Sequence, residues 1–106
     1  MNIAVSNKKG LAQVALEGEI NIYNAAALKA PLLDALEKCK KMDITLSNVS
    51  EMDSAGFQLL LLVKRESVNQ GKPMRLIDHS NATLEILDLY NMAGYFGDPV
   101  VMGREK

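Results

Sequence analysis

The sequence has too few metal ligands and thiols to build a metal site or a disulfide. It contains one cysteine, Cys39, and one histidine, His79. A structural zinc site takes about four such side chains and a disulfide takes two thiols, so neither can be assembled within one chain. We therefore expect no metal, no disulfide and no cofactor. Cys39 is expected to fill the core and His79 to lie in a loop.

The sequence also lacks an excess of charge of either sign and any long apolar run. Twelve Lys and Arg stand against 13 Asp and Glu, a net charge of −1, which argues against a nucleic-acid partner. The longest purely apolar run, Leu59–Val63, is far shorter than the roughly 20 residues that cross a bilayer. The first residues, Met1 to Ile3, have no signal-peptide character. We expect a cytoplasmic protein that does not insert into a membrane.

What remains is the composition of a compact globular domain. Hydrophobic residues make up 48% and charged residues 24% of the 106 residues, which is close to the usual balance. A chain of this length can bury one core and is too short for two independent domains. We expect a single domain over residues 1–106.

The hydrophobic pattern predicts several short strands. Ile3 and Val5 alternate with small or polar residues, and a β-prone run from Leu11 to Leu16 follows a turn at residues 7–10. These segments predict an N-terminal β-hairpin. Further strands are expected at residues 44–47, 74–77 and 100–102. A polar loop is expected from Asn48 to Asp53.

Apolar residues at three- and four-residue spacing predict helices between the strands. The first follows Asn24 as its N-cap. Because Pro31 removes a backbone donor, we expect this helix to kink there or to begin at Ala30. The second runs from Ala55 to Gln70 without a helix-breaking residue.

The third predicted helix is capped by Ser80 or Asn81 and ended by Asn91 with Gly94. Strands that alternate with helices at this spacing indicate an α/β fold. We expect a small mixed sheet of four to five strands, opened by the N-terminal β-hairpin and covered by about three to four helices.

The segment between the third predicted strand and the second helix carries the main candidate for function, Ser54. One interpretation is structural: Ser54 is the helix N-cap, and its hydroxyl satisfies a backbone N–H, which contributes about 1 kcal/mol. The other is functional: Ser54 is a phosphate acceptor, since free N–H groups and the helix dipole stabilise an anion at this end. The pattern alone leaves both open.

Residues 48–57 resemble the signature of the STAS domain family, the anti-sigma factor antagonists: Asn48-Val49-Ser50 precedes Met52-Asp53-Ser54-Ala55-Gly56-Phe57. The resemblance covers residues 3–96, including Gly18-Glu19 and the segments 24–36 and 84–96. The sequence from Ser50 to Leu60 is most similar to that of single-domain STAS proteins encoded with chemotaxis or two-component modules. The resemblance implies the STAS fold.

The resemblance also implies a function without catalysis, so no catalytic residue is expected. In the family, a partner serine kinase of the GHKL type, itself an anti-sigma factor, phosphorylates the serine after the motif Asp, here Ser54, and a PP2C-type phosphatase restores it. The unphosphorylated protein, a monomer or weak dimer, binds its partner and phosphorylation releases it. The expected partner-binding residues are Asp53, Ser54, Gly56, Phe57, Leu60 and Leu61.

The apolar residues of the second helix point almost all round its axis. Either neighbouring elements bury all of them, or Phe57 with Leu60 or Leu61 forms an exposed docking patch beside Ser54.

A second function is suggested by two positions where family members often have acidic residues. This chain has Asn21 and Thr45 there, which leaves Asp53 with fewer acidic neighbours. The alternative is a constitutive cytoplasmic STAS subunit of a lipid- or anion-transport complex, without phosphoregulation.

Overall fold

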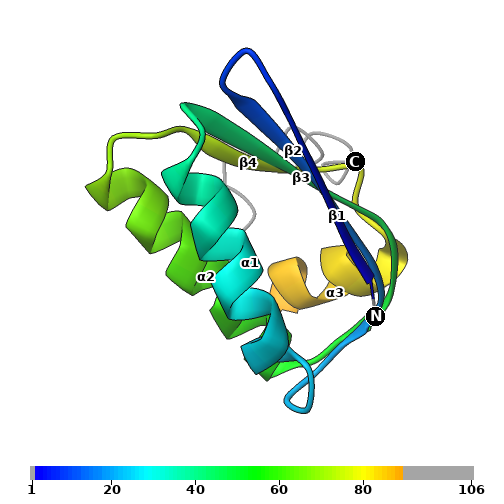
Figure 1. Ribbon diagram of the computed structural model, residues 1–106. Helices are drawn as coiled ribbons and strands as arrows, with labels where there is room; N and C mark the ends of the chain where they lie inside the picture. The colour runs from blue at the N-terminus through cyan, green and yellow to red at the C-terminus, as the bar shows by residue number, and fades with distance from the viewer. Residues whose placement is uncertain (1, 90–106) are drawn as a thin grey trace.

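A computed structural model describes residues 2–89 of the chain as a four-stranded sheet with three helices (Figure 1). The elements are β1 (Asn2–Lys8), β2 (Leu11–Ile20), α1 (Ala25–Glu37), β3 (Lys41–Met52), α2 (Ser54–Asn69), β4 (Met74–Ile77) and α3 (Asn81–Leu89). The strand order is β1-β2-β3-β4, with β1 antiparallel to β2 and the other pairs parallel. The predicted mixed α/β sheet is confirmed, and the strand expected at 100–102 lies outside the described residues.

The N-terminal hairpin is confirmed, and its turn is two residues long. Lys8 pairs with Leu11, and the two residues between them, Lys9 and Gly10, have φ of 55° and 89°. Two positive φ angles are typical of the type I′ turn, whose twist matches that of the flanking strands. The side chain of Asn7 supports the turn by accepting a hydrogen bond from the Gly10 N–H at 3.2 Å.

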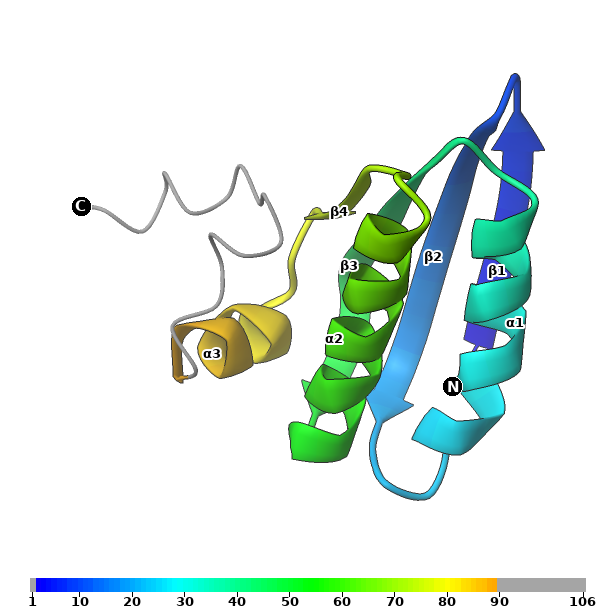
Figure 2. The same cartoon turned by 90° about the vertical axis from the view of Figure 1, so that its left-hand side faces the viewer.

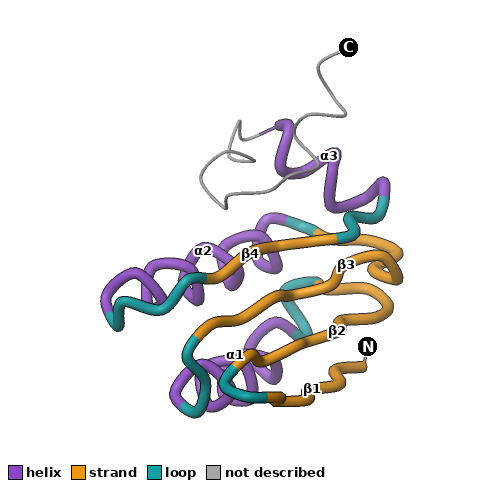
Figure 3. Tube along the Cα trace, turned by 90° about the horizontal axis from the view of Figure 1, so that it is seen from above, coloured by secondary structure: helices purple, strands orange, loops and turns teal. Residues whose placement is uncertain are grey.

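Helices α1 and α2 lie side by side on one face of the sheet (Figures 2 and 3). Each is the crossover between two parallel strands, α1 between β2 and β3 and α2 between β3 and β4. Ile20 and Met52, at the ends of β2 and β3, are paired in the sheet. Both helices therefore begin at the same edge of the sheet, and their N-termini are neighbours.

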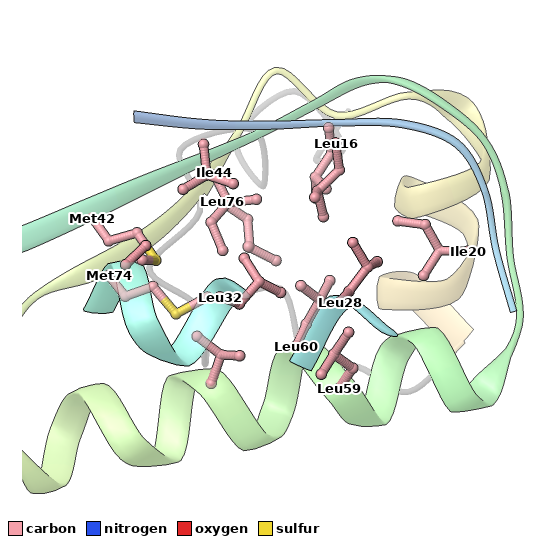
Figure 4. Close-up of a cluster of buried hydrophobic side chains, with 14 of the residues drawn as sticks. Leu16, Ile20, Leu28, Leu32, Met42, Ile44, Leu59, Leu60, Met74 and Leu76 are labelled. Carbon is pink, nitrogen blue, oxygen red and sulfur yellow. The ribbon is translucent and has the colours of Figure 1, made fainter. Parts of the chain in front are cut away.

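The core fills the space between the sheet and these two helices (Figure 4). The largest fully buried side chains are Leu16, Ile20, Leu28, Leu32, Leu36, Met42, Ile44, Leu46, Leu60, Met74 and Leu76. They come from three strands and both helices. Burial of this apolar surface is the main stabilising term for the fold.

The third strand is longer than predicted, and the loop expected from Asn48 to Asp53 is wrong. β3 pairs with β2 as far as Met52, so residues 48–52 are strand. The pairing shifts register twice, between Ala15 and Glu17 and between Gly18 and Glu19. These irregularities break the two-residue alternation from which the strand end was predicted.

The start of the first helix also differs from the prediction. α1 begins at Ala25 rather than Ala30, and Pro31 lies within it. Pro31 and Ala27, whose carbonyl loses its N–H partner, are both exposed, so water can supply the missing hydrogen bond. Asn24 is the N-cap residue, but its side chain makes no capping hydrogen bond.

The last described helix, α3, packs against β3. Ser80 caps it as expected, because its Oγ accepts a hydrogen bond from the Thr83 N–H at 3.2 Å. The predicted helix end at Asn91 and Gly94 lies outside the described residues. No helix within residues 2–89 is long and apolar enough to span a membrane.

The packing of α2 predicts different costs for two valine truncations on the same helix. Val63 is fully buried, whereas Val68 is 63% exposed. Val63→Ala removes two buried methyl groups, so we expect it to lower the free energy of unfolding by about 2 kcal/mol. Val68→Ala makes the same change in helix propensity, and we expect it to lower the free energy of unfolding by less than about 0.5 kcal/mol. Urea denaturation measures both, and equal losses would contradict the packing described.

Candidate functional site

Asp53, and not Ser54, caps the helix that carries the motif. β3 ends at Met52 and α2 begins at Ser54, with Asp53 in an extended conformation between them. Oδ1 of Asp53 accepts a hydrogen bond from the backbone N–H of Gly56 at 3.1 Å. A carboxylate here satisfies an orphaned donor and complements the helix dipole. The structural interpretation of Ser54 as N-cap is therefore wrong: Ser54 is the first residue of α2, and its side chain is exposed.

The same carboxylate binds a second loop. Oδ2 of Asp53 accepts a hydrogen bond from the backbone N–H of Ile22 at 3.1 Å, and the Asp53 N–H donates to the carbonyl of Ile20 at 3.2 Å. Asp53 thus joins the N-terminus of α2 to the loop between β2 and α1. This link is possible because the paired ends of β2 and β3 bring the two loops to the same edge of the sheet.

The loop between β2 and α1 is held by asparagine side chains. Asn21 Oδ1 accepts from the Tyr23 N–H at 2.9 Å, and Asn24 Oδ1 accepts from the Asn21 N–H at 2.9 Å. Asn24 Nδ2 also donates to the carbonyl of Glu19 at 2.8 Å. Such side chain to backbone bonds replace regular pairing in turns.

This loop presents two large apolar side chains to solvent, and we did not predict either from the sequence. Ile22 is 67% exposed and Tyr23 is 92% exposed. The signal that could have found them is the pair of asparagines at Asn21 and Asn24, whose spacing is typical of a structured loop. Ile22 and Tyr23 lie between them, and the N–H of Ile22 donates to Asp53.

Gly56 is required by close packing at this site. A Cβ at this position would lie 2.8 Å from Cγ2 of Ile20, 2.9 Å from the Ile20 carbonyl oxygen and 3.0 Å from Cγ of Met52. No side chain larger than hydrogen fits without a shift of the backbone. Gly56 is buried, so it positions the first turn of α2 against β2 and offers no side chain to a partner.

The docking patch expected on α2 is wrong for two of its residues. Phe57 is 3% exposed and Leu60 is 1% exposed, so both belong to the core, where Leu60 points toward the sheet (Figure 4). Leu61 is half-buried at the surface. The helix is apolar on most sides because the sheet covers one side and α1 packs against another. The structure therefore brings Asp53, Ser54 and Leu61 to the surface and removes Phe57 and Leu60 from it.

The two positions that lack acidic residues do not share one environment. Asn21 belongs to the loop that Asp53 binds, as described above. Thr45 precedes Asp53 by eight positions along the extended strand β3, which corresponds to about 26 Å. The expectation that Thr45 removes an acidic neighbour of Asp53 is wrong, because the part of β3 from Leu46 to Met52 separates the two residues.

Cys39 and His79 are placed as expected. Cys39 is buried just beyond the end of α1, where its thiol donates to the carbonyl of Leu36 at 3.4 Å. Burial raises the pKa of the Cys39 thiol, which disfavours the reactive thiolate. His79 lies in the loop between β4 and α3.

The packing at Gly56 predicts that alanine is destabilising there, although alanine normally favours a helix by about 1 kcal/mol. Gly56→Ala forces its new Cβ against the backbone of Ile20, so we expect a loss of about 1–3 kcal/mol in the free energy of unfolding. Thermal or urea denaturation measures the loss. Gln58→Ala, on the exposed face of the same turn, serves as the control and should change stability by less than about 0.5 kcal/mol. A Gly56→Ala protein as stable as the wild type would contradict the close approach.

The sequence matches one family over nearly its whole length. The family described as "Mlab, STAS domain" matches residues 3–102. A curated relative, the anti-sigma-B factor antagonist of Bacillus subtilis (strain 168), is 28% identical over 89 residues, which are 84% of this chain and 82% of the relative.

Solved structures share the fold. The anti-sigma factor antagonist SpoIIAA in its unphosphorylated form matches 92% of this chain and 87% of its own, with a TM-score of 0.77 and 17% identity. SpoIIAA of Bacillus in the phosphorylated form matches 90% of this chain and 87% of its own, with a TM-score of 0.73 and 17% identity. A sulfate transporter family protein from Wolinella succinogenes matches 87% of this chain and 75% of its own, with a TM-score of 0.72 and 18% identity. The family match and the shared fold agree, and the chain belongs to the STAS domain family.

Proposed function

We propose that this protein is a phosphorylation-controlled binding switch, similar to the anti-sigma factor antagonists, and that Ser54 is the residue phosphorylated. The observation that carries the proposal is the division of roles at the start of α2. Asp53 satisfies the helix N-terminus, and the neighbouring Ser54 is exposed and does not act as the cap. Ser54 is therefore accessible to a kinase, and its modification does not remove the helix cap.

A phosphate on Ser54 is compatible with the folded protein. It adds about −1.5 to −2 charges beside Asp53. In water, at a separation of about 6 Å, the repulsion is below roughly 1.5 kcal/mol. The N-terminus of α2 offsets part of this repulsion, because its backbone dipoles favour an anion. We expect the phosphorylated protein to stay folded.

The same phosphate is incompatible with a dry interface. An unpaired charge buried against a partner costs several kcal/mol, and every 1.4 kcal/mol is a tenfold loss of affinity. Phosphorylation therefore releases a partner that covers Ser54.

The surface beside Ser54 supports partner binding. Ile22 and Tyr23 are exposed on the loop that Asp53 binds, and aromatic side chains at such positions are frequent anchors of protein interfaces. Tyr23 presents its ring at a low cost in side-chain entropy. We propose that Tyr23 and Ile22 form the apolar part of the docking surface, in place of the buried Phe57 and Leu60.

The partner in this proposal is an anti-sigma serine kinase of the GHKL type. It transfers the γ-phosphoryl group of ATP to Oγ of Ser54, releasing ADP and a proton, and a PP2C-type phosphatase hydrolyses the ester. The supporting likeness is to a curated anti-sigma-B factor antagonist and to SpoIIAA, which has a phosphorylated form. The protein acts in the cytoplasm by binding, and its own residues catalyse no reaction.

A second candidate function uses the same surface without phosphorylation. The fold is shared with a sulfate transporter family protein, and the loop beside Asp53 carries Asn21 where family members often have an acidic residue. In this alternative the protein is a constitutive subunit of a transport complex, and Ser54 stays unmodified.

Incubation with the cognate kinase and ATP tests the switch. We expect one phosphate per chain on wild-type protein and on Ser50→Ala, and none on Ser54→Ala, as measured by intact mass. Ser50 is a matched control because it is an exposed serine four residues earlier, in β3.

Calorimetric titration of the partner completes the test. Ser54→Ala is expected to bind within threefold of the unphosphorylated wild type. Ser54→Asp is expected to bind at least tenfold more weakly, because it brings a charge into the interface. Equal affinities of the Ala and Asp variants would rule out the switch and favour the constitutive subunit.

A further inference from the structure

A solvent-exposed groove of about 400 Å³ lies between α1 and α2, the two helices that stand side by side in Figure 2. It is lined by Ala25, Ala26, Lys29, Ala55, Gln58, Leu59, Leu61, Leu62 and Arg65. Its floor is apolar, and Leu61 and Leu62 are only half-buried there. Of the partner-binding residues predicted from the sequence, only Leu61 lines this groove.

The groove begins next to Ser54. Ala55, the following residue, lines it. Ser54, Gln58, Leu61 and Arg65 follow one another at i, i+4, i+7 and i+11, so they lie along one stripe of α2. From Ser54 to Arg65 the stripe is about 16 Å long, which is about three helical turns.

The charged side chains that line the groove are both cationic. Lys29 comes from α1 and Arg65 from α2, and both are exposed. Within residues 2–89 the ion pairs are Lys38–Asp34 and Arg75–Asp43, so neither groove cation is neutralised by a carboxylate of the described chain. Another groove beside a helix, between β3 and α3, is instead lined by Glu51 and Glu85. An apolar floor with cations from both helices complements an apolar segment with acidic flanks.

We propose that this groove binds an acidic amphipathic helix of a partner protein. The apolar side chains of the partner helix cover Leu61 and Leu62, and the carboxylates of the partner helix pair with Lys29 and Arg65. A helix of about three turns matches the length of the stripe. A phosphate on Ser54 places a dianion at one end of this stripe and repels the acidic helix. This last step rests on the proposed function, whereas binding to the unmodified groove does not.

Two other occupants fit the charges less well. A two-fold dimer through this groove brings the same patch of both copies together, so cations face cations, whichever of Lys29 and Arg65 meet, and repel. An anionic membrane gains about 1 kcal/mol for each basic residue near its surface, and two cations supply little attachment. A protein segment of opposite charge meets neither difficulty.

A synthetic peptide tests the groove directly. The probe is a 14-residue helical peptide with leucines on one face and glutamates on the other positions, titrated into the full ¹⁵N-labelled protein. We expect the peptide to change the backbone amide chemical shifts of the protein at Ala26, Lys29, Gln58, Leu62 and Arg65. A control peptide with lysine in place of glutamate is expected to bind at least tenfold more weakly.

Matched charge reversals sharpen the test. Lys29→Glu combined with Arg65→Glu is expected to weaken the acidic peptide at least tenfold. Lys8→Glu combined with Lys41→Glu changes the net charge equally at exposed positions outside the groove, and should change the affinity less than twofold. Circular dichroism of each variant verifies the fold. If the acidic peptide bound the groove variant as tightly as the wild type, the proposal would be overturned. Chemical-shift changes at residues outside the groove would overturn it too.

The remaining outcomes separate the competing occupants and the two proposals. Self-association of the protein through the groove residues would also overturn the acidic-helix proposal. So would binding of the groove to vesicles containing phosphatidylserine, if the peptide does not bind. Ser54→Asp is expected to weaken the peptide several-fold relative to Ser54→Ala. Peptide binding to the unmodified groove supports the inference even if no kinase phosphorylates Ser54, so failure of the switch and failure of the groove give different results.

Discussion

The carboxylate of Asp53 joins the two loops on which the candidate site depends. Its Oδ1 accepts the Gly56 N–H and its Oδ2 accepts the Ile22 N–H, both at 3.1 Å. The first bond fixes the start of α2, and the second fixes the loop between β2 and α1. Because Asp53 does both, Ser54 is exposed at a helix N-terminus that is already capped, beside a loop that presents Tyr23. A modification of Ser54 can therefore change the surface without dismantling the element that holds it.

The rest of the fold makes this junction possible. Two parallel strands, β2 and β3, end at the same edge of the sheet, so the loops that follow them meet there. The absence of a Cβ at Gly56 lets α2 approach the end of β2 closely. α1 and α2 then leave this edge side by side, and the groove between them starts next to Ser54. The loop that presents Tyr23 and the groove that ends at Arg65 thus both begin at the edge of the sheet where Ser54 lies.

The sequence predicted those parts of the molecule that follow a regular pattern. The β-hairpin and the extent of α2 both depend on local signals, namely a Gly-containing turn and an unbroken apolar period. A family motif singled out the segment around Ser54, whose role stays a prediction. The end of β3 was missed because bulges break the alternation of buried and exposed residues. The burial of Phe57 and Leu60 was also missed, since periodicity shows that a face is apolar and not which neighbour covers it. The link from Asp53 to Ile22 joins residues 31 positions apart, and no local pattern contains it.

The proposed switch requires that cells change the phosphorylation of Ser54. Mass spectrometry of the protein purified from its native cell under contrasting growth conditions measures this directly, through the ratio of modified to unmodified peptide containing Ser54. The account predicts that the phosphorylated fraction changes with condition and that partner copurification changes in the opposite direction. Fully unmodified Ser54 under every condition, with a partner bound throughout, would contradict it.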